Sequence, residues 1–449
     1  MGDTTLSSDE DGGGGETKTT RRKYLRLGGA AAAGVLTGGA GVGSVSAQSG
    51  DILNVQDFGA VGDGTTDDTG AINSALDSAG SGDTVFLPAT GNSYYVTGRE
   101  SVIDINSSHD GVRLCGEGPD TRVTYGGGNA GSNVNVIALD PRNGGLENFL
   151  LDNLTLDGGL DAVEDDPNVA TGVQVHGPEG NTGRNVSMRI HNVRATNCWG
   201  NGISPGSSGT IVSNCTADNN RQHGFGAKND NTPFQDPPIL FVQCLGFGNG
   251  FGGGFYGIDL SGGKATVIDS VFRDNVGNGA TKVSVGANEM IYRRVRFENN
   301  EGLAFQDTGD GVNLAVFDDV IFNGHDRTFR LSNNGTYRVP SGSELIVANT
   351  GSDSRGGIFI TENGSFDAED GTVWVSGTGR GAGINDGSDG GSSSIGTYYH
   401  ASNDGGAIGS ENNISFGTVQ EGSRTDIDGV PTADQVGAWS GGFQCEGDE

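Results

Sequence analysis

The sequence predicts an all-β protein built as a parallel β-solenoid, with a short helix covering one end. A strand-sized apolar block recurs through the middle of the chain, at steps of 22, 29, 26, 25 and 25 residues. A period of about 20 to 50 residues is typical of stacked repeats. A polar turn rich in Asn and a second short strand follow nearly every block, and no helical pattern separates them. The blocks centre on Asn192, Asn214, Gln243, Asp269, Arg294 and Asp319.

Composition supports a turn-rich protein and restricts its partners. The 449 residues include 83 glycines without a collagen period, and 57 acidic against 26 basic residues give a net charge of −31. Such acidity with only five lysines indicates a halophilic protein, because concentrated salt screens self-repulsion. The alternative is that the charge serves solubility alone. Either way, the charge argues against nucleic acid or an anionic membrane as a partner.

Five cysteines, an odd number, are spread along the chain. Cys215 and Cys244 occupy equivalent places in consecutive repeats, so we expect them to stack in one interior column. A disulfide from Cys215 to a neighbour is the alternative. No C-x₂-C pair or nearby histidine pair accompanies them, so the spacing does not fit a zinc site.

The first 47 residues predict an export signal. Residues 20–26 contain Arg21-Arg22, an apolar run rich in Gly and Ala follows to about Val42, and small residues end at Ala47. This order is typical of a twin-arginine signal with its cleavage site, so we expect a secreted or cell-surface protein with no membrane insertion after cleavage. The predicted parts are an acidic extension and signal (1–47), an N-terminal cap (48–100), a β-helix (101–378) and a Gly/Ser/Asp-rich C-terminal segment (379–449).

The cap is predicted from a helical stretch between strands. Ile72, Ala75, Leu76 and Ala79 recur on one helix face, and Thr84–Pro88 and Tyr94–Val96 read as strands. A solenoid end exposes apolar core and open strand edges, so it needs a cover. We expect the helix that contains Ile72, Ala75 and Leu76 to be this cover.

Residues 54–97 resemble the opening of the pectate lyase superfamily, which includes polygalacturonase-like and rhamnogalacturonase-like proteins. The resemblance rests on Asp57-Phe58-Gly59-Ala60, Asp63-Gly64, Thr66–Thr69, Ala71-Ile72 and Val85–Pro88. It implies a single-stranded right-handed parallel β-helix that acts on acidic, pectin-like polysaccharide. It also implies that Asp63, Asp67 and Asp68 are structural.

A basic stripe is predicted on one outer face of the solenoid. Alternate residues of a strand face outward, and equivalent positions of successive coils form a column. Aligning the strand after each Asn turn gives the outward column Lys228, Asp259, Lys282, Gln306 and Arg330. We expect Lys228 and Gln306 to bind a uronate chain. Among the candidate catalytic residues, Asp259 would hold a cation or the substrate, and Lys282 or Arg330 would abstract the proton α to the carboxylate. The alternative is a solvated face with cross-coil ion pairs.

His223 lies just before this column, in the turn Arg221-Gln222-His223-Gly224-Phe225. Imidazole exchanges protons near neutral pH, so His223 is added to the candidate catalytic residues. The alternative is a residue that only shapes the turn.

Motifs of two related enzyme groups are incomplete. Polygalacturonase-like enzymes carry Asn-Thr-Asp, Asp-Asp, Gly-His-Gly and Arg-Ile-Lys patches. This chain offers only Gln222-His223-Gly224 and Asp318-Asp319, which follows His223 in the wrong coil order. Secreted alginate C5-epimerases are also similar in their opening and coils. Their Tyr-Gly-x-Asp-Pro-His patch, sought one coil before His223, falls on Asn201–Gly206, where the Tyr, Asp and His positions hold Asn201, Ser204 and Gly206.

Calcium is the one cofactor that the sequence suggests. Asp157, Asp161, Glu164, Asp165 and Asp166 form an acidic loop with closely spaced oxygen ligands, although it lacks the order of an EF-hand. An insertion loop with solvated charges is the alternative.

The sequence thus predicts an exported lyase or glycoside hydrolase acting on acidic polysaccharide. A non-catalytic carbohydrate-binding or cell-surface protein is the alternative, and a uronan C5-epimerase is a further one.

Overall fold

A computed structural model describes one unit of the protein, which lies within Ser49–Glu449. The described residues are 50–127, 134–141, 145–160, 170–176, 187–228, 237–307, 312–331, 334–351, 356–379, 381–388, 390–411 and 413–439. The predicted acidic extension and export signal lie outside them. None of the described helices is long and apolar enough to cross a membrane.

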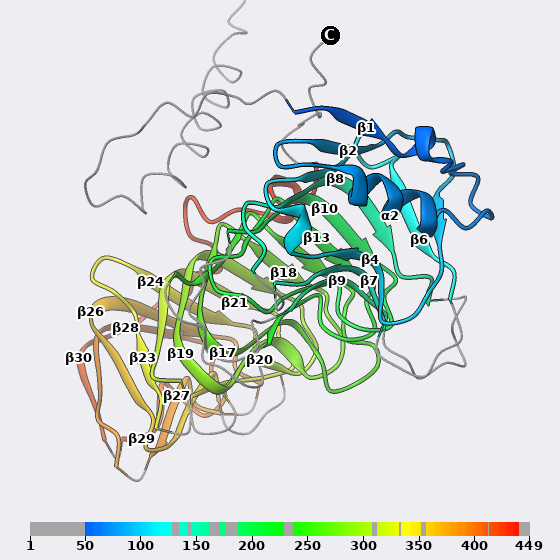
Figure 1. Cartoon of the computed structure of the whole chain (residues 1–449). Coiled ribbons are helices and arrows are strands. Elements are labelled where there is room, and N and C mark those ends of the chain that lie inside the picture. Colours follow the sequence, from blue (N-terminus) through cyan, green and yellow to red (C-terminus); the bar gives the residue numbers. More distant parts are fainter. Residues whose placement is uncertain are drawn as a thin grey trace, which may run out of the picture. The chain divides into compact units, whose positions relative to one another are not determined.

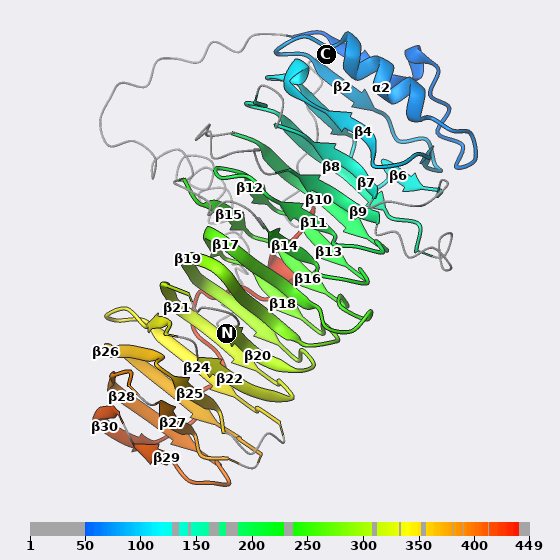
Figure 2. The ribbon, with the colours of Figure 1, turned by 60° about the horizontal axis from the view of Figure 1, so that its bottom comes forward.

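The described unit is a right-handed parallel β-helix, as the sequence predicts. Strands of successive coils pair side by side in register (Figures 1 and 2). Each coil adds to three ladders of parallel strands. The first ladder contains β1 (Ile52–Asn54), β2 (Thr84–Leu87), β5 (Arg113–Gly116), β8 (Leu150–Asp157), β10 (Arg189–Thr196), β12 (Ile211–Ser213), β15 (Ile239–Val242), β17 (Tyr256–Ile268), β19 (Gly279–Glu298), β21 (Leu314–Asn323), β23 (Thr336–Arg338), β26 (Ser365–Ser376), β28 (Ser393–Ala401) and β30 (Ile414–Glu421).

The long strands bend, so they belong to more than one ladder. The second ladder joins the ends of β8, β10, β19, β21, β26, β28 and β30 to β3 (Tyr94–Val96), β6 (Arg122–Tyr125), β13 (Thr216–Asp218), β16 (Leu245–Phe247), β18 (Val271–Arg273) and β24 (Glu344–Ala348). The third ladder joins the starts of β17 and β19 to β4 (Ser101–Ile105), β7 (Val134–Leu139), β9 (Ala170–Val175), β11 (Ile203–Pro205), β14 (Phe225–Lys228), β20 (Leu303–Asp307), β22 (Arg327–Leu331), β25 (Ile358–Glu362), β27 (Ile384–Ser388) and β29 (Ile408–Glu411).

The repeat centres found in the sequence are the corners between the first and second ladders. All six have a left-handed backbone, with φ between 49° and 57°. Asn and Asp tolerate this conformation better than most residues, which explains their abundance at these corners. The corner between the second and third ladders contains a buried ladder of amides. There the side chain of Asn249 donates to Asn275 at 2.9 Å, and that of Asn275 donates to Asn300 at 2.7 Å. Bonding from coil to coil satisfies amides that burial would otherwise penalise.

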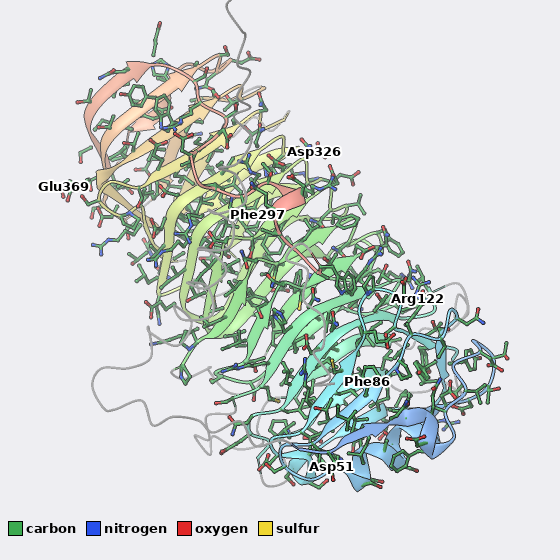
Figure 3. The ribbon with its side chains drawn as sticks, turned by 90° about the horizontal axis from the view of Figure 1, so that it is seen from above. Asp51, Phe86, Arg122, Phe297, Asp326 and Glu369 are labelled. Atoms are coloured by element: carbon green, nitrogen blue, oxygen red, sulfur yellow. The ribbon has the colours of Figure 1, made fainter. Side chains whose placement is uncertain are left out.

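Apolar side chains fill the interior along the whole stack. Phe272, Phe297 and Phe322 lie on successive coils and are fully buried, and the Phe297 and Phe322 rings stack with centroids 4.6 Å apart. Acidic side chains such as Asp51, Asp326 and Glu369, labelled in Figure 3, are exposed. The buried Cys198, Cys215 and Cys244 are free thiols, so the alternative of a disulfide from Cys215 is wrong. Cys115 is disulfide-bonded.

The first coil carries the predicted helical cap. α2 (Thr69–Ser78) buries Ile72, Ala75 and Leu76, and the short 3₁₀ turns η1 (Val55–Phe58) and η2 (Ser107–His109) contact it. The three aspartates of the family resemblance act structurally. Asp63 accepts from the turn amides of Thr65 and Thr66, and Asp67 accepts from Thr69 and Thr97. Asp68 is fully buried and accepts from the amides of Val61 and Gly62.

Replacing Asp68 with alanine is expected to lower the free energy of unfolding by about 2 kcal/mol, because two backbone N–H groups lose their acceptor. Denaturant unfolding in concentrated salt would measure the loss. Asp57→Ala is the control, since Asp57 is exposed. Equal stability of the two variants would contradict the assigned role of Asp68.

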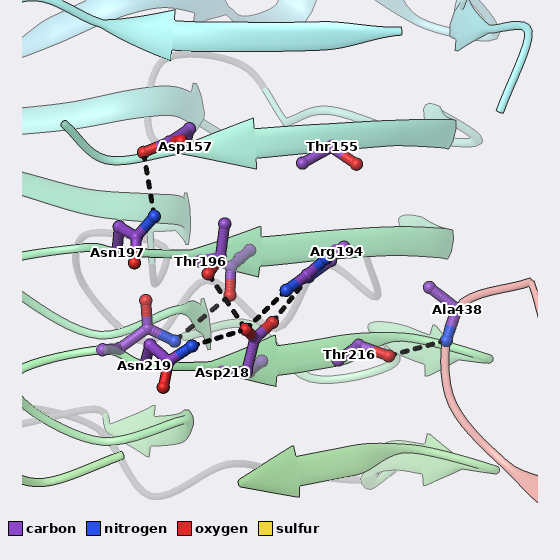
Figure 4. A network of polar contacts seen from close by, with 12 residues as sticks. Thr155, Asp157, Arg194, Thr196, Asn197, Thr216, Asp218, Asn219 and Ala438 are labelled. Atoms are coloured by element: carbon purple, nitrogen blue, oxygen red, sulfur yellow. Dashed lines mark hydrogen bonds and ion pairs between the residues drawn. The ribbon is translucent and has the colours of Figure 1, made fainter. Parts of the chain in front are cut away.

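β27 to β30 lie in the predicted C-terminal segment (379–449), and they continue the parallel coils as far as Glu421. The turns between these strands are rich in Gly, Ser and Asp, which weakens the apolar pattern in this part of the sequence. Residues 422–439, which include η4 (Ala433–Gln435), then run back along the outside of the second ladder. There Arg424 pairs with Glu344 at 2.6 Å, and the Ala438 amide donates to Thr216 Oγ1 at 2.8 Å (Figure 4).

Candidate active site

The third ladder brings four of the predicted site residues into one outer column. Asp259 pairs with Lys282, Lys282 with Gln306, and Gln306 with Arg330, one residue per coil. Their strand neighbours Ile258, Val283, Phe305 and Phe329 are fully buried, so this column faces outward. Adjacent strands are about 4.8 Å apart, so the column spans about 14 Å.

Lys228 does not join this column. Asp259 pairs with Gly226 in the preceding coil, whereas Lys228 pairs with Ser261, two residues further along the strand. A shift of two residues along a strand keeps a side chain on the same face. The alternation of inward and outward residues therefore cannot reveal such an error of register. The predicted basic column therefore lacks Lys228, and Gly226 occupies its place.

Asp259 is the centre of the site. It is only 4% exposed, and its two carboxylate oxygens meet three side chains. His223 Nε2 lies 3.2 Å and Lys282 Nζ 3.5 Å from Oδ2, and Ser261 donates to Oδ1 at 2.5 Å. A carboxylate buried to this degree requires such partners, and it in turn holds the lysine and the histidine in place.

The contacts of His223 determine which nitrogen carries its proton. The backbone N–H of Tyr256 donates to Nδ1 at 3.0 Å, so Nδ1 is an acceptor, and Nε2 carries the proton that faces Asp259. The Phe255 ring meets the imidazole edge-on, with centroids 5.2 Å apart. This arrangement makes His223 a donor that orients Asp259.

Tyr256 belongs to the site and was missed in the sequence. Its ring stacks on His223 with centroids 5.9 Å apart, Lys282 Nζ lies 5.8 Å from its ring centroid, and its hydroxyl donates to Gln306 Oε1. Burial and then the charge of Asp259 raise the pKa of Tyr256 to about 12, so the phenol is protonated at neutral pH. The available signal was Tyr256-Gly257-Ile258-Asp259, which reads Tyr-Gly-x-Asp one coil after His223 instead of one coil before it.

Arg330 ends the column with unused hydrogen-bonding capacity. Its Nε is buried and makes no hydrogen bond. Behind it, the buried Asp307 accepts from Tyr337 Oη, and also from the Val312 amide at 3.1 Å. Burial outweighs these bonds and raises the pKa of Asp307 to about 6. The site therefore offers two cations on its outer face, at Lys282 and Arg330.

The calcium prediction concerns a loop that is mostly outside the described residues. Asp157 Oδ1 accepts the Gly159 amide at 3.1 Å, and residues 161–166 lie beyond the described part of the chain. Within that part, no group of three or more His, Cys, Asp or Glu side chains is placed to hold a metal ion.

Comparison with known proteins supports the predicted superfamily. Residues 52–245 match the family described as "Rhamnogalacturonase A/epimerase, pectate lyase-like". Mannuronan C5-epimerase AlgE1 of Azotobacter vinelandii is 38% identical over 111 residues, which are 24% of this chain and 8% of that protein. The match thus spans a small part of this relative.

Solved structures agree with the fold. The A-module of Azotobacter vinelandii mannuronan C-5 epimerase AlgE6 superposes with a TM-score of 0.55 and 18% identity, over 83% of this chain and 100% of that chain. The AlgE4 A-module gives a TM-score of 0.54 and 17% identity, over 81% and 99%. At such identities the likeness concerns the fold alone.

Proposed function

We propose that this protein acts on a uronic acid polysaccharide by removing the proton at C5, next to the sugar carboxylate. The observation that carries the proposal is the outer column of Asp259, Lys282, Gln306 and Arg330, with Tyr256 and His223 against it. Support comes from the relatives named as mannuronan C5-epimerases. Epimerisation is the outcome we favour, and elimination by a lyase shares its first step.

Substrate binding needs local positive charge, because a protein with a net charge of −31 repels a polyanion. Arg330 offers a guanidinium for the sugar carboxylate, and a planar fork suits a carboxylate well. Lys282 lies two coils away in the same column, held by Asp259. His223 shares Oδ2 of Asp259 with Lys282, and Ser261 donates to Oδ1, so His223 and Ser261 are positioning residues.

The proposed step transfers one proton off C5 and one back on. Lys282 meets the polymer as an ammonium group and loses a proton to solvent before it acts. The neutral amine then takes the C5 proton while the C–H electrons move into the carboxylate, which becomes an enolate held by Arg330. Tyr256 then donates its phenolic proton to the opposite face of C5, which inverts that carbon. In an elimination, the enolate would instead expel the C4 oxygen, and Tyr256 would protonate that oxygen.

Glycoside hydrolysis is less well supported. It ordinarily needs two carboxyl groups flanking the bond, and Asp259 is the one carboxylate among the described members of the column, from Gly226 to Arg330. Export through the twin-arginine pathway and adaptation to high salt remain predictions.

Incubation of the protein with polymannuronate or polygalacturonate in D₂O, at high salt and with or without calcium, tests the proposal. Proton NMR is expected to show deuterium at C5 and inverted residues. Ultraviolet absorbance of unsaturated ends would instead identify a lyase. Reducing ends without either signal would mean hydrolysis, and binding without any reaction would favour the carbohydrate-binding alternative, so both results would contradict the proposal.

A further inference from the structure

A second group of side chains adjoins the proposed reaction centre at its His223 end. Three successive coils stack here, because the Arg221 amide donates to the Cys198 carbonyl at 2.8 Å and the Gly252 amide donates to the Arg221 carbonyl at 2.9 Å. The stacking places the Arg221 guanidinium carbon 3.7 Å from the ring centroid of Trp199. The indole is itself fixed, since Nε1 donates to the Leu160 carbonyl at 3.3 Å.

The Arg221 guanidinium is held in place without a charged partner. No described residue gives it an ion pair or a hydrogen bond, although the chain carries 57 acidic residues. Gly252 leaves room for it, because a Cβ at that position would come within 2.7 Å of Arg221 Cγ. A guanidinium that stacks on an indole keeps the donors on its edge available for a carboxylate.

An exposed aromatic ring lies in the loop that covers this arginine. Phe251 is 47% exposed, and it is one of four large apolar side chains that are exposed among the described residues. The flanking Gly250, Gly253 and Gly254 have positive φ values, which suit glycine and turn the loop tightly. Exposing such a ring to water costs free energy, which a ligand with an apolar face recovers by covering it.

The loop connects this group directly to the proposed reaction centre. Phe255, four residues after Phe251, packs edge-on against the His223 ring, and His223 is two residues after Arg221. A polymer bound at Asp259 and Lys282 would therefore continue past these side chains. A uronate residue has both features that they match, an anionic carboxylate and an apolar ring face.

We propose that Arg221, Trp199 and Phe251 form a second uronate-binding subsite beside the reaction centre. Arg221, supported by Trp199, pairs with a sugar carboxylate, and Phe251 packs against the apolar face of a sugar ring. The subsite rests on the proposed function in that the polymer is a uronan. It adds affinity and a preference for longer chains, and it takes no part in the proton transfer.

Titration calorimetry of the full chain in concentrated salt tests the subsite, with oligomannuronates and oligogalacturonates of increasing length as probes. Arg221→Ala and Phe251→Ala are each expected to weaken binding of the longest oligomer about tenfold, a loss of about 1.4 kcal/mol. Both should leave binding of the shortest oligomers, and kcat on saturating polymer, near the wild-type values. Val419→Ala, which trims another exposed apolar side chain, is the control.

Carboxyl-reduced oligomers separate the two contacts. They should remove the penalty of Arg221→Ala and keep that of Phe251→Ala, a difference that a merely structural arginine would not produce. Arg221→Lys, which keeps the charge, guards against misfolding of the alanine variant. If the wild-type protein binds oligouronates and the variants match it at every length, the subsite is wrong and the proposed function stands. If the wild-type protein binds none of them, the proposed function itself is wrong.

Discussion

Replacing Lys282 with arginine is expected to leave uronan binding nearly intact and to abolish deuterium exchange at C5. Arginine keeps the positive charge beside Asp259 but does not release its proton in proteins, so it cannot act as a base. Loss of a general base lowers kcat by roughly 10²–10⁴. Lys282→Met removes the charge as well and should weaken binding too. NMR-detected exchange and titration calorimetry on the same samples would measure both quantities.

Lys264 provides a matched control for this experiment. It also lies in the outer part of the solenoid, its side chain is 28% exposed against 26% for Lys282, and it approaches the carboxylate of Glu289 to 3.5 Å. Lys264→Met should leave both binding and exchange unchanged. If Lys282→Arg exchanges C5 protons at the wild-type rate, then Lys282 supplies charge only, and another group is the base.

The fold could be predicted because single residues at the corners of the coils mark the repeat. A left-handed corner favours Asn or Asp, which occupy four of the six corners, and steps of 22 to 29 residues reveal the repeat without any long-range information. The cap was equally visible, since Ile72, Ala75 and Leu76 follow a helical period over a short and strongly patterned stretch. The sequence pattern did not reveal β27 to β30, because the Gly-, Ser- and Asp-rich turns between them interrupt the apolar periodicity.

The site was only partly predictable. The alternation of inward and outward residues predicted which side chains of the third ladder face outward. The predicted residues Asp259, Lys282, Gln306 and Arg330 do occupy successive positions on that outer face. Alternation could not give the register, so Lys228 was aligned two residues away from its place. Tyr256 belongs to the site because it contacts His223, Lys282 and Gln306, which lie on three other coils. These contacts depend on the geometry of the loops, which cannot be inferred from the periodicity of the strands.

Asp307 is expected to make the stability of the protein fall as pH rises through about 6. Burial favours the neutral acid, so the pKa in the folded protein is about 6, against 3.8 for the ordinary group. Because the folded-state pKa is the higher one, the stabilising contribution is fully present below about pH 4 and is lost as pH rises through about 6. The difference of pKa corresponds to about 3 kcal/mol.

The groups around Asp307 oppose one another. Hydrogen bonds from Tyr337 and the Val312 amide, with the Arg330 charge, favour the carboxylate, whereas burial and the Glu362 charge favour the acid. The Asp307→Asn variant has no ionisable group at this position. The difference between its unfolding free energy and that of the wild type should therefore shift by about 3 kcal/mol in favour of the variant between about pH 4 and pH 8. Urea unfolding across this range would measure the gain, with the exposed Asp326→Asn as control. Parallel pH profiles for wild type and Asp307→Asn would mean that Arg330 and the hydrogen bonds outweigh burial, and that Asp307 stays ionised behind the cationic end of the column.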